Sequence, residues 1–328
     1  MNSIKDDALA KARVLAGAYG HILERPVVYT QGVSLTGRLL LSDLDHSYPD
    51  PREEITRITS EYVENPDNAF DASDGTANYA GVNWASLMGD DARYRHLLIT
   101  TADRFMQLDE DGFPSVLDRD FRVEDMFFAG TVLQRATHST GNARYVQLSG
   151  EFVLECADRL LQSNGLYWHC LSSPFFWGRG NGFAALGFAE SLVRCEGGLR
   201  TKLIDRHVEH LVGLREHQDD QSGMWRQVVD RPDSYTESSS TCMIGISIAL
   251  GIRHGWLSAD EWGEILARAW AGVSDGIDEQ GGVSRVCVGT GPLDNLNDYL
   301  IRDSVTGLDD RGGAMALWFA VEMVRCGL

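Results

Sequence analysis

The sequence lacks the long apolar segments of a membrane-spanning protein. No run approaches the roughly 20 apolar residues that a helix needs to cross a bilayer. Positive charge is also scarce, because 29 lysines and arginines stand against 48 aspartates and glutamates, for a formal net charge of -19. Nucleic-acid binding requires a basic surface, so this balance argues against a nucleic-acid partner. It leaves room for an anionic small ligand, since a few fixed arginines can dominate one pocket.

Paired cysteines and metal-ligand spacings are missing as well. The six cysteines are scattered without a CxxC pair, which predicts reduced thiols and a cytoplasmic location. No zinc-ligand spacing, P-loop, nucleophile elbow or dinucleotide fingerprint occurs, so we expect neither a metal nor an organic cofactor. His207 and His210 lie three residues apart without supporting cysteines or carboxylates, and we interpret them as ordinary surface or packing residues.

Alternation of apolar and polar residues, which marks a half-buried strand, is not sustained, whereas apolar residues at helical spacing recur along the chain. About eleven helices are expected from this spacing. They include segments near residues 3–22, 121–137, 202–217, 237–254, 260–273 and 311–326. The stretch from Val27 to Leu41 differs, because it is β-branched and broken by glycines, which favours an extended or hairpin segment.

Two connectors between expected helices, residues 89–94 and 141–145, both end in Ala-Arg-Tyr, which suggests a repeated helix pair. Short connections between helices imply antiparallel neighbours. An even ring of such pairs, with polar loops at one end, is an α/α barrel. We therefore predict an all-α protein, an (α/α)6 barrel of six helical hairpins, formed by a single catalytic domain over residues 1–328. A helical solenoid is the alternative, but it requires a clearer period.

The rest of the chain is organised around one stretch, Trp177-Gly-Arg-Gly-Asn-Gly-Phe183, which opens an apolar helix. Its glycines allow another backbone or a ligand to come close. An aromatic face on Trp177, a fixed cation on Arg179 and the Asn181 amide at a helix N-terminus suit a polar, anionic ligand. His169 adds a polar group just upstream. The alternative is a glycine-rich entry to a core helix, with Arg179 in a structural ion pair.

Two adjacent acids, Glu124 and Asp125, precede the apolar residues 126–128 at the start of an expected helix. Successive helix positions point about 100° apart, so only one acid is expected to face a pocket. A carboxyl among aromatic neighbours has a raised pKa and can serve as a general acid and base. The alternative is negative charge at a helix N-terminus, which the helix dipole stabilises.

Tyr235 and Glu237 lead into the hydroxyl residues 238–241 at the start of another apolar helix. Helix capping by Ser or Thr, with an acid in the first turn, explains part of this pattern. Four hydroxyl residues in a row exceed what a cap requires, so the lining of a sugar pocket is an equally good interpretation.

Two further acidic groups lie in turns. The segment 309–311, Asp-Asp-Arg, opens the last expected helix either as a turn with an Asp–Arg ion pair or as a substrate contact. Asp71 and Asp74 belong to a turn-rich loop, and we include Asp74 among the candidate substrate contacts.

In this order the motifs resemble those of unsaturated rhamnogalacturonyl hydrolases (glycoside hydrolase family 105) and, more distantly, unsaturated glucuronyl hydrolases (family 88). The central stretch 177–183 is similar to the family's Trp-x-Arg-Gly-Asn-Gly-Trp. Residues 235–243, Tyr-Thr-Glu-Ser-Ser-Ser-Thr-Cys-Met, resemble its Tyr-x-Glu-x-Ser-x-Thr-x-Met stretch, and the closing glycine-rich helix with Glu322 is also similar. The resemblance spans most of the chain.

This resemblance implies an (α/α)6 barrel without a metal that acts on oligosaccharides ending in a 4,5-unsaturated uronic acid. A carboxyl protonates C4 and helps water attack C5, and the hemiketal that results opens to release the sugar. The resemblance also implies that Arg179 holds the substrate carboxylate and that Trp177 stacks on the ring. His169 and Asn181 would then bind hydroxyls.

The sequence departs from the family's pattern in two places. Alignment of residues 126–128 with the family's aromatic run puts Glu124 at the catalytic Asp, whereas a shift of one residue restores Asp125 but spoils the aromatic register. Residues 169–172 read His-Cys-Leu-Ser where the family tends to have His-Gly-Trp-Asp. A lyase or sugar epimerase on the same barrel, with His169 or Tyr235 as base, and a carbohydrate-binding protein without turnover are the alternatives.

Overall fold

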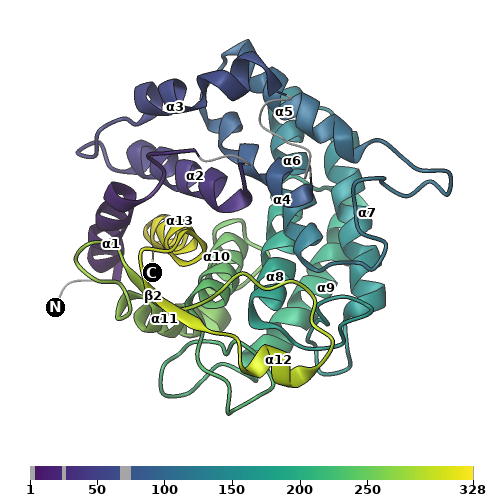
Figure 1. Ribbon diagram of the computed structural model, residues 1–328, viewed down its shortest axis with the longest axis vertical. Helices are drawn as coiled ribbons and strands as arrows, with labels where there is room; N and C mark the ends of the chain where they lie inside the picture. Colours follow the sequence, from purple (N-terminus) through teal and green to yellow (C-terminus); the bar gives the residue numbers. More distant parts are fainter. Residues whose placement is uncertain (1–3, 24–26, 67–74, 328) are drawn as a thin grey trace.

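The helices close into a ring, as the computed structural model, which describes residues 4–23, 27–66 and 75–327, shows (Figure 1). The inner elements are α2 (Tyr29–Leu44), η2 (Ala80–Leu87), α6 (Glu124–Thr140), α8 (Gly178–Leu192), α10 (Ser238–Arg253) and α13 (Asp310–Cys326). Each inner element packs against the next, and α13 closes the ring against α2. The predicted (α/α)6 barrel is confirmed.

An outer layer alternates with the inner one along the chain. It consists of α1 (Ile4–Ala18), α3 (Arg52–Glu64), α5 (Ala92–Phe105), α7 (Ala143–Leu160), α9 (Gly197–Arg215) and α11 (Ala259–Ser274). Outer helices such as α7 bury one face, whereas every residue of the inner helix α8 is buried. Because an outer helix separates successive inner ones, the inner helices run in the same direction and their N-termini share one end of the barrel.

The prediction of an extended or hairpin segment for Val27–Leu41 was wrong, because this stretch forms the inner helix α2. A helix that is buried almost all round has no apolar stripe, so helical periodicity does not reveal it. Its glycines are sites of close packing: a Cβ on Gly32 would lie 2.4 Å from the Gly81 carbonyl oxygen, and one on Gly37 would lie 2.6 Å from the Leu317 side chain.

The two similar connectors occupy equivalent places, each leading from an inner element to an outer helix. Gly89 and Gly141 both adopt positive φ, 80° and 72°, a conformation that favours glycine. Asp91 and Asn142 then cap α5 and α7 by accepting a hydrogen bond from the backbone N–H two residues on. The repeated helix pair that the sequence suggested is therefore a real structural repeat.

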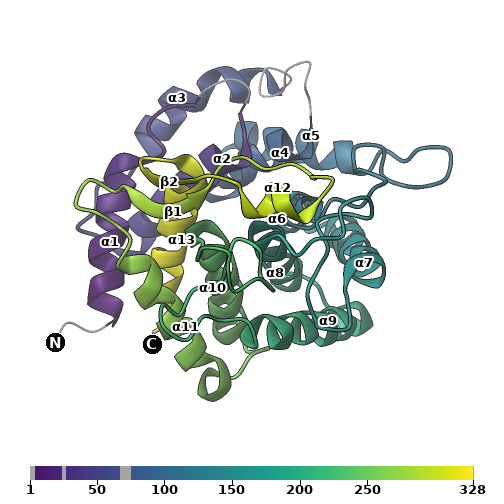
Figure 2. The same ribbon diagram turned by 60° about the horizontal axis from the view of Figure 1, so that its bottom comes forward.

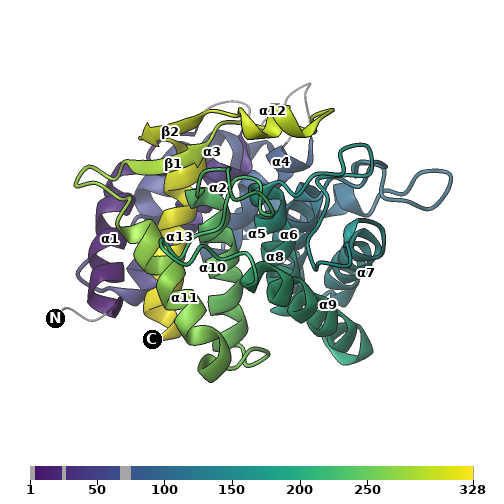
Figure 3. The same cartoon turned by 90° about the horizontal axis from the view of Figure 1, so that it is seen from below.

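A covering segment, residues 283–307, lies across the end of the barrel where the inner helices begin (Figures 2 and 3). It contains β1 (Val283–Cys287), α12 (Leu296–Leu300) and β2 (Ser304–Gly307). β1 and β2 pair antiparallel with an irregularity between Val283 and Val286, where Arg285 takes a φ of 58°. β1 packs on α10 and α13. A short helix, α4 (Thr76–Tyr79), precedes η2.

Close packing of α6 on α8 depends on Gly187. A Cβ at this position would lie 2.5 Å from the carbonyl carbon of Met126, a backbone atom that cannot move aside. We expect Gly187→Ala to lower the free energy of unfolding by about 1–3 kcal/mol, measured by urea denaturation. Gly17→Ala is the matched control, because Gly17 lies in α1 with nothing within 4 Å and its replacement is expected to stabilise by up to about 1 kcal/mol. A Gly187→Ala variant as stable as the wild type would contradict this packing.

Candidate active site

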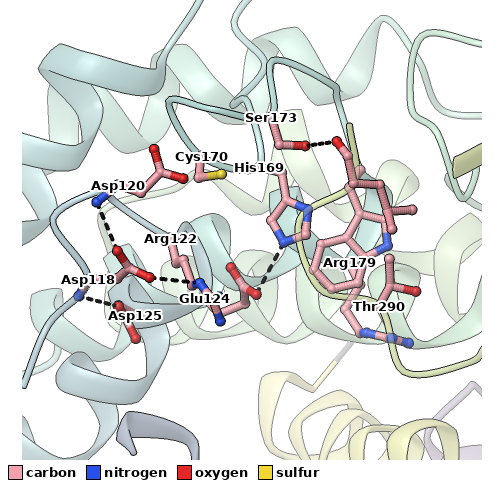
Figure 4. A network of polar contacts seen from close by, with 12 residues as sticks. Asp118, Asp120, Arg122, Glu124, Asp125, His169, Cys170, Ser173, Arg179 and Thr290 are labelled. Carbon is pink, nitrogen blue, oxygen red and sulfur yellow. Dashed lines mark hydrogen bonds and ion pairs between the residues drawn. The ribbon is translucent and has the colours of Figure 1, made fainter. Parts of the chain in front are cut away.

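The two adjacent acids at the start of α6 point to different partners (Figure 4). Glu124 Oε1 lies 3.2 Å from His169 Nε2. Asp125 accepts hydrogen bonds from the Thr76 hydroxyl at 2.5 Å and from the Asp118 backbone N–H at 3.3 Å. The divergence that helix geometry predicts is therefore present, and only Glu124 turns toward His169.

The two carboxyls also differ in charge state. Burial, with a smaller contribution from the neighbouring Glu124 carboxylate, raises the pKa of Asp125 to about 7, although the hydrogen bonds from Thr76 and from the Asp118 backbone N–H lower it. Burial opposes ionisation of Glu124 too, but the charge and hydrogen bond of His169 outweigh it and bring the pKa of Glu124 below its usual value. Neighbouring acids with separated pKa values are a feature of catalytic sites.

One of the two carboxylate oxygens of Glu124 is not engaged by the described residues. Its Oε2 is buried and has no hydrogen-bond partner among the described residues. Buried polar atoms are nearly always paired, because an unmade hydrogen bond is costly. Asp125, by contrast, uses both of its oxygens within the protein. Of the two acids, Glu124 is therefore the one with an atom available to a ligand or to water.

The loop that carries His169 is tied to the loop before α6. The Val123 N–H donates to the His169 carbonyl at 3.0 Å, and the Leu171 N–H donates to the Asp120 carbonyl at 2.9 Å. The Asp120 carboxylate accepts from both the N–H and the hydroxyl of Ser172, at 2.9 and 2.5 Å. These bonds hold the imidazole next to Glu124, and they give Ser172, at the second departure from the family's pattern, a structural partner.

The Trp177 ring lies in contact with both His169 and Arg179. The His169 and Trp177 ring centroids are 4.4 Å apart, with an angle of 31° between the planes. The Arg179 guanidinium carbon lies 4.9 Å from the Trp177 ring centroid, within the range of a cation–π contact. The structure thus brings Glu124 together with three of the residues that the sequence proposed for the substrate.

Arg179 is buried but forms no ion pair with an acid in the described part of the chain. Its Nη1 donates to the Cys287 carbonyl at 2.7 Å and the Ser239 hydroxyl at 3.2 Å, and its Nη2 donates to the Val288 carbonyl at 2.8 Å. Two of the five guanidinium hydrogens therefore hold the covering segment, and a third holds Ser239 at the start of α10. Nε–H and the second Nη2–H, which form the bidentate edge for a carboxylate, have no partner among the described residues.

Asn181 is part of the frame of the site. Its amide donates to the Tyr167 and Trp177 carbonyls, both at 3.0 Å, and its oxygen accepts from the Tyr167 N–H at 2.9 Å and from His210 Nε2 at 3.2 Å. These four bonds use the full capacity of the side chain. His207 and His210 are both buried, which confirms that they are packing residues.

Glu237 is the N-cap of α10. Its carboxylate accepts from the Ser239 and Ser240 backbone N–H groups and from the Cys287 N–H at 3.0 Å. The acid, and not one of the hydroxyl residues, therefore makes the cap and also holds β1. Tyr235 donates to the Asp303 carbonyl at 3.3 Å, at the other edge of the covering segment.

Asp309 and Arg311 form the turn and ion pair that the sequence offered as one interpretation. Asp309 caps α13 through the Arg311 N–H at 2.9 Å, and its carboxylate also pairs with the Arg311 guanidinium. Asp71 and Asp74 lie outside the described residues. No three His, Cys, Asp or Glu side chains in the described ranges are grouped so that they could hold a metal ion.

Sequence reasoning missed three residues of the site. Thr76 and Asp118 bind Asp125, and Tyr299 binds His169 Nδ1 at 2.5 Å. Each is a single polar residue in a loop or short helix. The partners of Thr76 and Tyr299 are distant in sequence, and Asp118 binds Asp125 only through its backbone N–H, which its residue type does not reveal. The available signal for Tyr299 was an aromatic residue inside the polar stretch 289–303, which is unusual unless that residue is buried.

The candidate site lies against the covering segment and is largely buried. Glu124 is 9% exposed, and His169, Trp177 and Arg179 are 2% exposed or less. A cavity of about 970 Å³ lies instead at the far end of α6, where Thr137, His138 and Arg194 contribute to its lining. That cavity is away from the acids. None of the described helices combines the length and apolar character needed to cross a membrane.

Two curated proteins are similar to part of the chain. An unsaturated rhamnogalacturonyl hydrolase, YesR, from Bacillus subtilis (strain 168) is 32% identical over 154 residues, which cover 47% of this chain and 42% of that protein. An unsaturated 3S-rhamnoglycuronyl hydrolase from Alteromonas sp. (strain LOR) is 25% identical over 181 residues, which cover 50% of this chain and 43% of that protein. The matches therefore span less than half the length of these relatives.

A solved structure extends the similarity to the whole fold. A possible member of family GH105 from Klebsiella pneumoniae subsp. pneumoniae MGH 78578 superposes with a TM-score of 0.83 at 19% identity, over 97% of this chain and 93% of that chain. At this identity the likeness concerns the fold. The sequence model of Glycosyl Hydrolase Family 88 matches residues 123–327, from the residue before Glu124 to the end of α13. The chain belongs to glycosyl hydrolase family 88.

Proposed function

We propose that this protein is a glycoside hydrolase that removes a 4,5-unsaturated uronic acid from the non-reducing end of lyase-generated oligosaccharides. The observation that carries the proposal is the buried Oε2 of Glu124, which lies beside His169 and Trp177 and has no hydrogen-bond partner within residues 4–23, 27–66 and 75–327. The names of the two curated relatives, which refer to unsaturated rhamnogalacturonyl and rhamnoglycuronyl substrates, support it. Residues 1–328 act as one catalytic domain, in the cytoplasm.

The reaction is hydration of a vinyl ether. The Glu124 carboxyl donates its proton to C4, the electron pair of the C4=C5 bond forms the new C–H bond, and the ring oxygen stabilises positive charge at C5. Water then attacks C5 and returns a proton to the Glu124 carboxylate. The hemiketal opens and the leaving sugar departs, so the acid is regenerated and the consumed reagent is water.

The Glu124–His169 pair supplies the proton. In the free protein His169 lowers the pKa of Glu124, which favours the carboxylate form of this side chain. An anionic substrate in the site raises carboxyl pKa values by like-charge repulsion. Binding of the uronate therefore favours the protonated Glu124 carboxyl that the reaction requires.

The end of the barrel that carries Glu124 and Arg179 suits an anion, although the protein as a whole is acidic. The N-termini of the inner helices share this end of the barrel and contribute positive dipole ends. The Nε–H and Nη2–H edge of Arg179, which no residue in the described part of the chain occupies, matches the two oxygens of a carboxylate, and Trp177 offers an apolar face for a sugar ring. Asn181 and Glu237, whose polar atoms are engaged within the protein, position these groups.

Arg179→Lys is expected to weaken binding of the anionic substrate by about 10- to 100-fold, the worth of a charge-assisted hydrogen bond to a carboxylate. A lysine ammonium cannot hold the carbonyls of Cys287 and Val288 and present a two-point edge at the same time. The measurement is KM, or affinity on an inactive background. Arg206→Lys, an exposed arginine on α9, is the control. Two results would contradict this role of Arg179. In the first, Arg179→Lys binds the anionic substrate as tightly as the wild type does. In the second, the wild type binds a neutral analogue as tightly as the anionic substrate.

The test of the proposed function is incubation of the wild-type protein with lyase-digested pectin, ulvan, xanthan and glycosaminoglycan fragments. Hydration removes the conjugated double bond, so its ultraviolet absorbance is expected to fall with at least one of these. A polysaccharide lyase would instead create the double bond from saturated chains and raise the absorbance. Burial raises the pKa of Tyr235, the alternative base, far above its usual value, which disfavours the phenolate that a lyase requires.

A further inference from the structure

We propose that Tyr299 is a positioning residue that fixes the tautomer of His169 and thereby keeps the imidazole lone pair directed at Glu124. Tyr299 does not reach the substrate in this account. It acts through His169, whose Nδ1 contacts Tyr299 and whose Nε2 contacts Glu124. The inference rests on the proposed function of Glu124 and adds the group that controls its proton.

The hydrogen bonds around Tyr299 are consistent with one assignment of donors and acceptors. The Ser173 hydroxyl donates its single hydrogen to the Leu293 carbonyl at 2.8 Å. The bond of 2.7 Å between the Ser173 and Tyr299 hydroxyls must then use the Tyr299 hydrogen. The Tyr299 oxygen is left as an acceptor, and it receives the Leu293 N–H at 3.2 Å.

His169 is therefore a donor at Nδ1. Its Nδ1 lies 2.5 Å from a Tyr299 oxygen that has already given its hydrogen to Ser173, so the bond requires Nδ1–H. The bond that one imidazole nitrogen makes determines the state of the other. In the neutral ring the lone pair is on Nε2, which lies 3.2 Å from Glu124 Oε1.

This arrangement decides where the shared proton can go. With Nδ1–H fixed, a proton on Nε2 can pass to Glu124 and leave a neutral imidazole that accepts a hydrogen bond from the carboxylic acid. In the other tautomer Nε2 keeps its hydrogen, and the neutral imidazole can pair only with a Glu124 oxygen that carries no proton. The acid that protonates C4 would then lose its partner.

Tyr299 is suited to this task by its place in α12. Its side chain is fully buried, and Phe175 packs against it with ring centroids 5.4 Å apart. Asn295 caps the short helix by accepting from the Asp298 N–H at 3.1 Å. Burial raises the pKa of Tyr299 to about 12, so the phenol keeps the hydrogen that it gives to Ser173. The covering segment thus contributes a side chain to the site that it covers.

The direct test is the tautomer itself, read by nitrogen-15 NMR of the imidazole in the wild-type protein. The His169 signal is identified among the nine histidines by its loss in His169→Gln. We expect the nitrogen that carries the hydrogen in neutral His169 to be Nδ1, and we expect Tyr299→Phe to shift His169 toward the Nε2–H form. A wild-type His169 in the Nε2–H tautomer would overturn the proposal, whatever the activity.

The kinetic test is a split between kcat and KM. Tyr299→Phe is expected to lower kcat by about 10- to 100-fold, the usual cost of losing the partner that orients a functional histidine, with KM changed by less than about threefold. Tyr145→Phe is the matched control, because the Tyr145 hydroxyl binds Asp103 at 2.6 Å on the outer layer. Its kcat is expected to equal that of the wild type.

The outcomes separate this inference from the proposed function. Loss of kcat together with the shifted tautomer supports the role of Tyr299. A Tyr299→Phe variant with wild-type kcat and an unchanged His169 signal shows that the hydroxyl is structural only. If the wild-type protein leaves every unsaturated substrate intact, the proposed function fails, while the NMR result still confirms or overturns the tautomer assignment.

Discussion

Glu124→Gln is expected to lower kcat on an unsaturated uronyl oligosaccharide by about 10²- to 10⁴-fold, the usual worth of general acid–base catalysis. Glutamine keeps the size of the side chain and can still hydrogen-bond His169 Nε2. It has no proton to give to C4 and cannot accept one from water. Substrate binding, measured by calorimetry or by protection against thermal unfolding, is expected to survive because Arg179 and Trp177 are unchanged.

Asp125→Asn is the neighbouring comparison. Its carboxyl is occupied by Thr76 and by the Asp118 N–H, so the amide has to reorganise these bonds, and we expect the cost to fall mainly on stability. The activity lost is expected to be smaller than in Glu124→Gln. An active Glu124→Gln beside a folded but inactive Asp125→Asn would show that the catalytic position has been assigned one residue too early.

The second prediction with a large expected effect concerns the loss of folding stability at acid pH. Burial lowers the pKa of His207 from about 6.5 to about 3, so the folded protein keeps this ring neutral. Below pH 6.5 the unfolded chain binds a proton that the folded chain does not, and stability falls as pH falls. We expect His207 to contribute a slope of about 1.4 kcal/mol per pH unit between pH 5.5 and 4, and about 4–5 kcal/mol in total by pH 3.

The slope is measured by urea denaturation at several pH values. His207→Gln is expected to reduce it by about 1.4 kcal/mol per pH unit, whatever the variant costs at neutral pH. Ser247→Ala is the control: it removes the hydroxyl 2.7 Å from His207 Nε2 but leaves the buried ring, so it is expected to lose stability with the slope retained. Equal slopes in the wild type and His207→Gln would contradict the neutral, buried state of His207.

Asp125 contributes with the opposite sign. Because the pKa of Asp125 is raised to about 7, the folded protein binds a proton there before the unfolded chain does, and this contribution to stability grows as pH falls from 7 toward 4. The free energy of unfolding of the wild type, plotted against pH, is therefore a sum in which the contribution of Asp125 partly offsets that of the buried His207. Comparison of slopes between variants, in place of the curve itself, isolates His207.

Local patterns predicted those parts of the fold that local forces decide. Amphipathic outer helices follow from apolar spacing, and the connectors with Gly89 and Gly141 follow from turn and capping chemistry. The inner helix α2 could not be predicted in this way, because its residues are buried nearly all round and its glycines reflect contacts with Gly81 and Leu317. Such contacts exist only after the barrel has closed.

The candidate site also combines features that local sequence decides with features that depend on long-range contacts. The divergence of Glu124 and Asp125 was predictable, since it depends on helix geometry alone. The link between His169 and Tyr299 was not, because it joins residues 130 positions apart through a short helix that has no periodic signal. The use of Arg179 to hold the Cys287 and Val288 carbonyls was hidden for the same reason, as the covering segment meets α8 only in the folded chain.

The central claim is that Glu124 adds water to a vinyl ether, and the most direct measurement uses a matched pair of oligosaccharides with the same linkage. One ends in a 4,5-unsaturated uronic acid and the other in its saturated counterpart. With the wild-type protein we expect the unsaturated member to lose its ultraviolet absorbance and to release one leaving sugar for each double bond lost, while the saturated member stays intact. Release of sugar from the saturated member, with no dependence on the double bond, would contradict the account.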